Sequence, residues 1–301
     1  MPPLERKQDF FYTLWNVPYP RNPFFTGREE VLEQLRKVLA TSKTAALSQP
    51  QAICGLGGIG KTQTAVEYAY RYRDKYDTVL WAKGDSVESL ISDFVAISSW
   101  LNLPDKDAKD QNLAVVAVKR WLESNNGWLL IFDNADEPKI IEDFIPPNPK
   151  GHILLTSRAQ VFDNLGITNP LELDKMLPDE AKQFLIKRTG RSNLDPVETN
   201  AIKQLAQELD YLPLALEQAG AYITKLKCNF QDYLTSYRTR GLELLEQAKV
   251  MIGKYPKSVA TTWSLNFEQV ARTSSAAADL LYVSAFLNPY SIPLELITQG
   301  G

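Results

Sequence analysis

The sequence predicts an α/β fold with a doubly wound, mostly parallel sheet, followed by an all-α region. Up to about residue 168, short apolar runs alternate with stretches of helical periodicity, which is typical of βαβ units. One of these runs, Trp128–Phe132, is apolar at every position, as expected of a strand that is buried on both faces. Beyond about residue 170 the strand patterns fade and helical patterns remain.

Composition and charge narrow the class of protein. The 301 residues are 44% apolar and 23% charged, as in an ordinary globular protein. The net charge is −3, from 33 basic and 36 acidic residues, and there is no long Lys/Arg block, so we expect no direct DNA binding. No apolar run approaches the roughly 18–20 residues that cross a bilayer, so we expect no membrane span.

The cysteines and the histidine exclude further kinds of chemistry. Cys54 and Cys228 lie far apart, and the N-terminus lacks the apolar core of a signal peptide, so we expect reduced thiols and a cytoplasmic protein. His152 is the single histidine, which argues against a His-based metal cluster and a Ser-His-Asp triad. The chemistry must therefore come from backbone amides, carboxylates, lysines and arginines.

The N-terminal region predicts an arm and then a helix. Residues 1–24 carry five prolines and many aromatic residues, which predicts an extended arm whose aromatics dock on the next domain. Thr26 and Glu29 have the spacing of a capping box, with Thr26 as the N-cap. Apolar residues follow at helical spacing, so we predict a helix over about 27–40.

The remaining elements follow from periodicity. Four strands are predicted over Gln51–Cys54, Thr78–Ala82, Trp128–Phe132 and Ile153–Thr156. The helices between them are predicted over Lys61–Tyr72, 86–101 and 111–124. In the all-α region, helices are predicted over Pro178–Arg188, Asp195–Leu209, Pro213–Lys225, 240–251, 259–270 and 275–287. The first three open at or beside a proline, which the first helical turn tolerates.

The strongest motif is a glycine-rich loop between a predicted strand and a predicted helix. Residues 55–62, Gly-Leu-Gly-Gly-Ile-Gly-Lys-Thr, fit the phosphate-loop pattern G-x-x-x-x-G-K-[ST]. Glycines let main-chain N–H groups approach an anion, and the N-terminus of the next helix adds partial positive charge. Lys61 adds a full charge near the β- and γ-phosphates, and the Thr62 hydroxyl is a hard oxygen ligand suited to Mg²⁺.

Two further strand ends carry candidate site residues. Asp133 follows the apolar strand at the edge of the sheet where ligands bind, and we predict that it holds Mg²⁺ through water; the alternative is a capping or turn aspartate. Arg158 follows the next strand at the same edge, where it can reach a γ-phosphate. On spacing alone, a solvated arginine at a strand end is an equally good interpretation.

Together these motifs resemble the NB-ARC family of STAND P-loop NTPases, over roughly residues 20–300. Asn22–Glu29 resembles the family's lead-in segment, whose backbone and arginine line the adenine pocket. GLGGIGKT, LLIFDNAD and LLTSR resemble its phosphate loop, Walker B strand and sensor strand, with Arg158 as the sensor. Tyr211–Leu216 resembles the GLPLAL motif, whose proline packs on the nucleotide base. The closing residues resemble the opening of a winged-helix domain, most closely in members that continue into tetratricopeptide repeats.

The resemblance implies a P-loop NTPase that binds ADP or ATP with Mg²⁺. It implies an N-terminal arm (1–24), a nucleotide-binding α/β domain (25–168), a helical domain (169–250) and the start of a winged-helix domain (251–301), truncated within it. Lys61, Asp133 and Arg158 are the implied catalytic residues, and Thr62 and Asp133 are the implied metal ligands. The implied nucleotide contacts are Phe25, Gly27, Arg28, Gly55, Gly57, Gly58, Ile59, Gly60, Lys61, Thr62, Gln63, Arg158, Pro213 and Leu214.

The sequence departs from the family pattern in three places. Asn134 stands where the family often has a second acidic residue that orients water; a neutral amide is a poor general base, so we expect slow hydrolysis, with Asp136 as a candidate substitute. Tyr211 stands where GLPLAL has glycine. The family's Met-His-Asp motif is absent, and we expect the chain to end before it.

The implied function is that of a regulatory switch in an NLR-like signalling protein of innate immunity. Its ADP form would be compact and resting, and its ATP form would be open and able to self-oligomerise, with unknown sensor and effector partners. The alternatives are an AAA+-type ATPase with rapid turnover, a nucleotide-dependent scaffold that does not hydrolyse, and a small-molecule kinase. Asn134 argues against rapid turnover, and no Arg-rich lid of the kind a kinase needs precedes residue 170.

Overall fold

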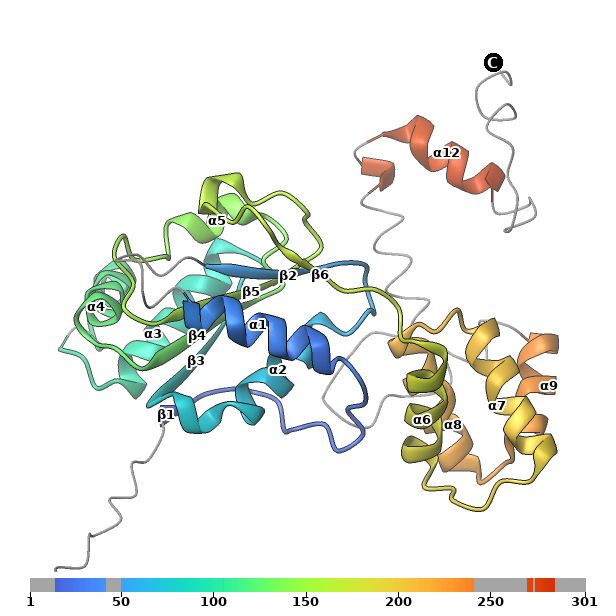
Figure 1. Ribbon diagram of the computed structural model, residues 1–301. Coiled ribbons are helices and arrows are strands. Elements are labelled where there is room, and N and C mark those ends of the chain that lie inside the picture. The colour runs from blue at the N-terminus through green and yellow to red at the C-terminus, as the bar shows by residue number, and fades with distance from the viewer. Residues whose placement is uncertain (1–13, 42–49, 105, 241–269, 273, 285–301) are drawn as a thin grey trace, which may run out of the picture.

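The computed structural model describes residues 14–41, 50–104, 106–240, 270–272 and 274–284, which form an α/β domain and a helical domain (Figure 1). The strands are β1 (Leu14–Trp15), β2 (Gln51–Cys54), β3 (Thr78–Lys83), β4 (Trp128–Asp133), β5 (His152–Ser157) and β6 (Leu171–Glu172). The helices of the α/β domain are α1 (Glu29–Thr41), α2 (Lys61–Arg71), α3 (Val87–Trp100), α4 (Gln111–Ser124) and α5 (Pro138–Glu142). None of the helices in the described ranges is long and apolar enough to cross a bilayer.

The strands form one parallel sheet in the order β1-β3-β4-β5-β2-β6, which confirms the predicted α/β class. Because the strands are parallel, their carboxyl ends share one edge. The loop after β2, the aspartate that ends β4 and the arginine after β5 therefore lie along the same edge. β5 separates β2 from β4, so these two strands do not hydrogen-bond directly.

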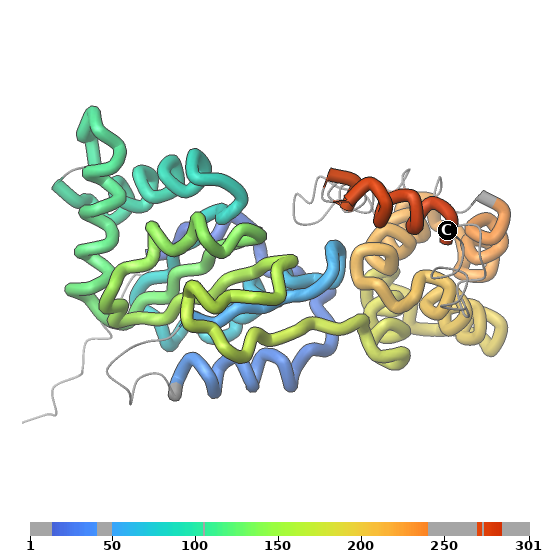
Figure 2. Tube along the Cα trace, turned by 90° about the horizontal axis from the view of Figure 1, so that it is seen from above, coloured from blue at the N-terminus to red at the C-terminus, as the bar shows by residue number. Residues whose placement is uncertain are grey.

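Both faces of the sheet are buried, because alternate side chains of the central strands enter two separate apolar clusters. One face packs against α1 and α2 through Ile53, Val79, Leu129, Ile131 and Leu154. The opposite face packs against α3 and α4 through Ala52, Leu80, Leu130, Phe132 and Leu155. Figure 2 shows the resulting layers, with α1 on one side of the sheet and α3 and α4 on the other.

The helical domain consists of α6 (Pro178–Thr189), α7 (Pro196–Glu208), α8 (Pro213–Leu226) and α9 (Phe230–Arg240). Proline occupies the first turn of α6, α7 and α8, as predicted. The helix α9 was not predicted. The predicted helices over 240–251 and 259–270 lie almost entirely outside the described residues, whereas the one over 275–287 corresponds to α12 (Ser275–Ser284).

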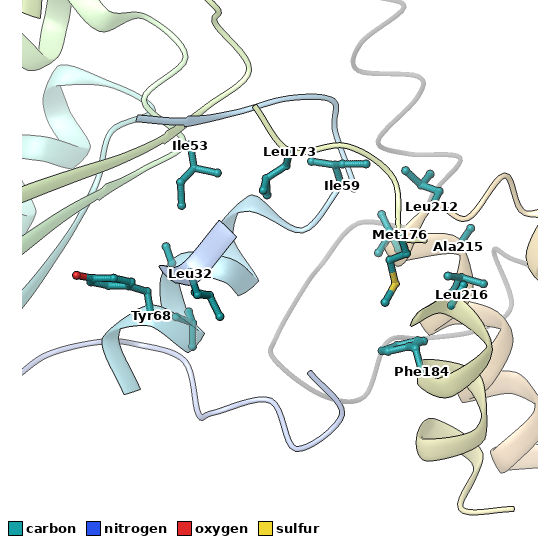
Figure 3. Packing of buried hydrophobic residues seen from close by; sticks show 14 of the residues in the cluster. Leu32, Ile53, Ile59, Tyr68, Leu173, Met176, Phe184, Leu212, Ala215 and Leu216 are labelled. Atoms are coloured by element: carbon teal, nitrogen blue, oxygen red, sulfur yellow. The ribbon is translucent and has the colours of Figure 1, made fainter. Parts of the chain in front are cut away.

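The core of the helical domain is continuous with the cluster on the α1–α2 face of the sheet. Ile59 from the loop after β2 lies between Leu173, from the connection between β6 and α6, and Leu212 of the helical domain (Figure 3). All three side chains are buried. Burying an aliphatic side chain of this size stabilises the folded state by about 1.5–3 kcal/mol. The apolar contact therefore holds the helical domain against the loop after β2.

The described part of the N-terminal arm docks on α2 and β3 through Trp15 and Tyr19, as predicted, whereas Phe10, Phe11 and Tyr12 lie outside the described residues. The Trp15 ring packs on Tyr70 with centroids 4.8 Å apart, and the Tyr19 ring packs on Trp81 at 5.5 Å. Further along, Arg21 donates two hydrogen bonds, of 3.0 and 2.8 Å, to the buried carboxylate of Glu67 on α2. The pairing of β1 with β3 was not predicted, because a strand of two residues shows no periodicity.

The predicted capping box at Thr26 is wrong. The Thr26 hydroxyl donates to the Phe24 carbonyl at 2.8 Å, and the Glu29 carboxylate pairs with Arg71 on α2. Gly27 and Arg28 both adopt left-handed conformations, with φ of +72° and +65°, so α1 begins at Glu29 and not near residue 27. Contacts with distant helices therefore override the local capping signal.

Candidate nucleotide-binding site

The glycine-rich loop joins β2 to α2 at the carboxyl edge of the sheet, in the context that the motif requires. Gly58 within it has φ of +81°, and a Cβ at this position would lie 3.1 Å from the Cβ of Leu214 in α8. Glycine is therefore needed at position 58 both for the turn and for the close approach of the helical domain. Gly60 precedes the first residue of α2, so the loop ends at a helix N-terminus, which favours anions.

Lys61 is held in the loop by main-chain carbonyls. Its Nζ donates to the Gly55 carbonyl at 2.8 Å and to the Leu56 carbonyl at 2.9 Å. The side chain is 9% exposed, and desolvation lowers its pKa to about 8, opposed by the charge of Asp136. A desolvated ammonium group beside a helix N-terminus favours the binding of an anion.

Thr62 and Asp133 bring two oxygen atoms together. The Thr62 hydroxyl donates to Asp133 Oδ1 at 2.7 Å, and the Thr156 hydroxyl of β5 donates to the same atom at 2.6 Å. Asp133 is buried, and desolvation raises its pKa while the two hydroxyl groups lower it. A hydroxyl and a carboxylate are the hard donors that Mg²⁺ takes beside nucleotide phosphates, so these residues fit that metal.

The described residues contain no cluster of three or more His, Cys, Asp or Glu side chains that would hold a metal ion by themselves. Mg²⁺ in phosphate sites takes one or two protein ligands and completes its shell with phosphate and water, and Thr62 and Asp133 are donors of that kind. Thr156 has no predicted role, yet it fixes the Asp133 carboxylate. In the sequence, the feature that could have indicated this role is a hydroxyl residue at the end of an apolar strand.

Arg158 lies at the same edge and is held by Asp136. Its main-chain N–H donates to Asp136 Oδ1 at 2.6 Å, and its guanidinium donates to Oδ2 at 2.7 Å. Arg158 shares a cavity of about 520 Å³ with the loop residues Gly55, Leu56 and Gly57 and with the connection Glu172–Lys175. Arg158, the predicted sensor, therefore lines the same cavity as the glycine-rich loop, and its guanidinium forms an ion pair with Asp136.

The lead-in segment and the GLPLAL-like motif both reach the loop from a distance. In the lead-in segment, Asn22 donates to Gln63 at 3.1 Å and the Arg28 guanidinium donates to the Ile59 carbonyl at 3.3 Å. The Phe25 carbonyl accepts from Lys187 of α6 at 3.0 Å. On the other side, the Leu214 N–H, one residue after Pro213, donates to the Gly58 carbonyl at 3.2 Å.

Tyr211 is the second departure from the family pattern, and its backbone is unusual. Its φ is +54°, a left-handed conformation that glycine adopts freely and other residues adopt at a cost. The turn is held by two main-chain hydrogen bonds: Tyr211 N–H donates to the Ala206 carbonyl at 2.9 Å, and the Tyr211 carbonyl accepts from Met176 at 3.1 Å. Tyr211 thus adopts a backbone conformation that glycine would adopt without strain.

Comparisons with known proteins agree with this geometry. No family model matches the chain. The chain is 29% identical to a nucleotide-binding leucine-rich repeat (NLR)-like protein of Hyaloscypha variabilis, over 94% of this chain and 31% of that protein. It is 28% identical to the regulatory protein AfsR of Streptomyces griseus, over 66% of this chain and 21% of that protein. It is 23% identical to the disease resistance protein RPS5 of Arabidopsis thaliana, over 72% of this chain and 26% of that protein.

The chain therefore spans a third or less of the length of these relatives. Among solved structures, Cdc6p from Pyrobaculum aerophilum matches with a TM-score of 0.52 and 16% identity, over 70% of this chain and 65% of that chain, which shows likeness of fold alone. The phosphate loop, the parallel sheet and the disease resistance and NLR-like relatives lead to one conclusion. They support an NB-ARC/STAND type of P-loop NTPase.

Proposed function

We propose that this chain is the ADP/ATP-dependent switch of a longer NLR-like signalling protein. The observation that carries the proposal is the hydrogen bond between the Leu214 N–H of α8 and the Gly58 carbonyl of the phosphate loop. The loop that would hold the phosphates is thus in direct contact with the helical domain. A change in the bound nucleotide that moves this loop would move the helical domain with it.

The proposed ligand contacts follow from the geometry of the site. The amides of the loop and the Lys61 ammonium bind the phosphates, and Thr62 and Asp133 hold Mg²⁺. Bound Mg²⁺ would neutralise part of the phosphate charge. Pro213 packs on the base, and the backbone of the lead-in residues Phe25–Arg28 lines the adenine pocket together with it. Support comes from the position of both segments next to the loop.

Arg158 is the proposed sensor of the γ-phosphate. Support comes from its place in the cavity beside Gly55–Gly57 and from the Asp136 carboxylate that holds its guanidinium. A third phosphate would compete with Asp136 for the same guanidinium. ATP and ADP would then differ in one charge-assisted interaction at the carboxyl edge of the sheet.

The proposed hydrolysis is slow. Asn134 cannot act as a base, and the Asp136 carboxylate is paired with Arg158. The ADP form is then the compact resting form and the ATP form the open, self-oligomerising one, in a cytoplasmic protein whose Cys54 and Cys228 remain free thiols. Converting a 1:99 population into 99:1 needs about 5.5 kcal/mol of differential affinity, so domains beyond this chain would contribute to the change.

The nucleotide content of the purified protein tests the proposal. We expect denatured protein to release ADP, which ion-exchange chromatography of the supernatant would identify. Calorimetric titration with MgADP and MgATP should then give saturable heats after the bound nucleotide is removed. Absence of an adenine nucleotide together with flat titrations would overturn the proposed switch. Turnover of many ATP molecules per second would instead favour the AAA+-type ATPase.

A further inference from the structure

Arg28 combines an unusual backbone with an unusual set of contacts. Its φ of +65° follows the φ of +72° at Gly27, so two consecutive residues are left-handed just before α1. The Glu180 carboxylate of α6 holds this turn: its Oε1 accepts the Arg28 N–H at 3.2 Å and lies 2.1 Å from where a Cβ on Gly27 would be. Left-handed residues other than glycine cost energy and gather at functional sites.

The Arg28 guanidinium donates to two main-chain carbonyls. Its Nη2 donates to Ile59 in the phosphate loop at 3.3 Å and to Asp174, between β6 and α6, at 2.5 Å. Burial lowers the pKa of this guanidinium, although the charges of Glu180 and Asp174 oppose the shift. The side chain thereby ties the phosphate loop to the connection that leads into the helical domain.

The direction of a loop carbonyl fixes the direction of the next amide. In a planar trans peptide the C=O and the following N–H point to opposite sides. A hydrogen bond from Arg28 to the Ile59 carbonyl therefore turns the Gly60 N–H away from Arg28. Other loop carbonyls also have donors: Gly55 and Leu56 accept from Lys61, Gly58 accepts from Leu214, and Gly60 accepts from the N–H and hydroxyl of Thr64. The Arg28 side chain reaches the loop from a distant part of the chain, whereas Lys61 and Thr64 belong to the start of α2.

We propose that Arg28 is a positioning residue for phosphate binding: it holds the Ile59 carbonyl so that the Gly60 amide faces the bound phosphates. This role differs from the contact with the base that the family resemblance implies for Arg28. The inference rests on the proposed function, because it requires that the loop binds nucleotide phosphates.

The test is a comparison of MgADP with magnesium pyrophosphate, which has phosphates and no base. Arg28→Gly removes the guanidinium and suits the left-handed backbone, so the turn is kept. We expect both affinities, measured by calorimetry, to fall by the same factor of about ten or more, because a hydrogen bond from a charged group is lost. The ratio of the two affinities should stay as it is in the unsubstituted chain.

Chemical rescue separates positioning from a general loss of structure. Guanidinium ion at millimolar concentration should restore pyrophosphate binding to Arg28→Gly, since it can occupy the site of the missing group. Arg120→Ala, at an exposed position on α4, should leave both affinities unchanged and serves as the control. Arg28→Lys keeps the charge without the planar guanidinium and should give an intermediate loss of affinity for both ligands. This second variant tests the proposal even if Arg28→Gly does not fold.

Three outcomes would contradict the proposal. A loss for MgADP with unchanged pyrophosphate binding would mean that Arg28 contacts the base or ribose. Unchanged affinity for both ligands, or a loss that guanidinium does not restore, would leave Arg28 as a support of the fold only. Failure of the unsubstituted chain to bind either ligand would instead overturn the proposed function itself.

Discussion

The two sides of the phosphate loop are built from different parts of the chain. The side with Lys61 and Thr62 is formed by the loop and the start of α2, and it is completed by Asp133 at the end of β4. The opposite side is formed by carbonyls, and the groups that hold them come from the lead-in segment and from α8. The first side has the charged and hydroxyl groups of a ligand site, whereas the second side connects the α/β domain to the helical domain.

Substitutions on the two sides should therefore affect different properties of the protein. Changes on the first side should alter nucleotide affinity and leave the fold intact, because its groups serve a ligand. Changes on the second side should alter the stability of the contact between the domains, because its groups satisfy other parts of the chain, and at Arg28 they should also lower phosphate affinity through the Ile59 carbonyl.

The largest effect is expected for Lys61→Ala. Affinity for MgADP should fall about 100-fold, close to 3 kcal/mol, because a buried charge that meets the phosphates is lost. The thermal midpoint without nucleotide should change little, because desolvation already disfavours the charged form of Lys61 there. Calorimetry and thermal unfolding measure the two quantities, with Lys225→Ala as the control. A large fall in the thermal midpoint with a small fall in affinity would show that the Lys61 side serves the fold and not the ligand.

Gly58→Ala tests the second side, with Gly166→Ala as its match. Both glycines are left-handed, with φ of +81° and +69°, so each substitution should cost about 1 kcal/mol of backbone strain. A Cβ at position 58 would also press on Leu214, whereas nothing lies within 4 Å at position 166. We expect Gly58→Ala to cost about 1 kcal/mol more in denaturant unfolding. Equal losses of unfolding free energy for Gly58→Ala and Gly166→Ala would show that the contact with α8 does not contribute to stability.

Arg158→Ala should have a smaller and selective effect. ATP affinity should fall about five- to ten-fold, close to 1 kcal/mol, while ADP affinity stays the same, because ADP lacks the third phosphate. Competition between the two nucleotides in calorimetry gives the ratio directly. An equal loss for both nucleotides would contradict the sensor role and would place Arg158 among the general phosphate contacts.

The smallest effect is expected for Thr26→Ala. Because the Thr26 hydroxyl bonds to the Phe24 carbonyl and does not cap α1, the loss should stay below about 0.5 kcal/mol. Ser86 is the comparison, since its side chain accepts the Ser89 N–H at the start of α3, and Ser86→Ala should cost about 1 kcal/mol. If Thr26→Ala lowered the free energy of unfolding as much as Ser86→Ala does, Thr26 would cap α1 and the predicted capping box would be correct.

Local patterns were sufficient for the central elements of the fold. The strands β2, β4 and β5 are buried on both faces, so their central positions select apolar residues and the run is visible in the sequence. In contrast, β1 and β6 have two residues each, and they form because β3 and β2 supply hydrogen-bond partners. Similarly, α9 begins where the Glu198 carboxylate of α7 accepts the N–H groups of Phe230 and Gln231.

The same division holds in the candidate site. Lys61 and Thr62 belong to one short motif, and Asp133 follows from the rule that parallel strands end at a common edge, so the sequence alone placed them together. The links from Arg28 to Ile59, from Glu180 to Arg28 and from Leu214 to Gly58 came only from tertiary packing. Periodicity records which face of an element is buried. It contains no information on which distant carbonyl a guanidinium or an amide will meet, because that depends on how whole domains pack.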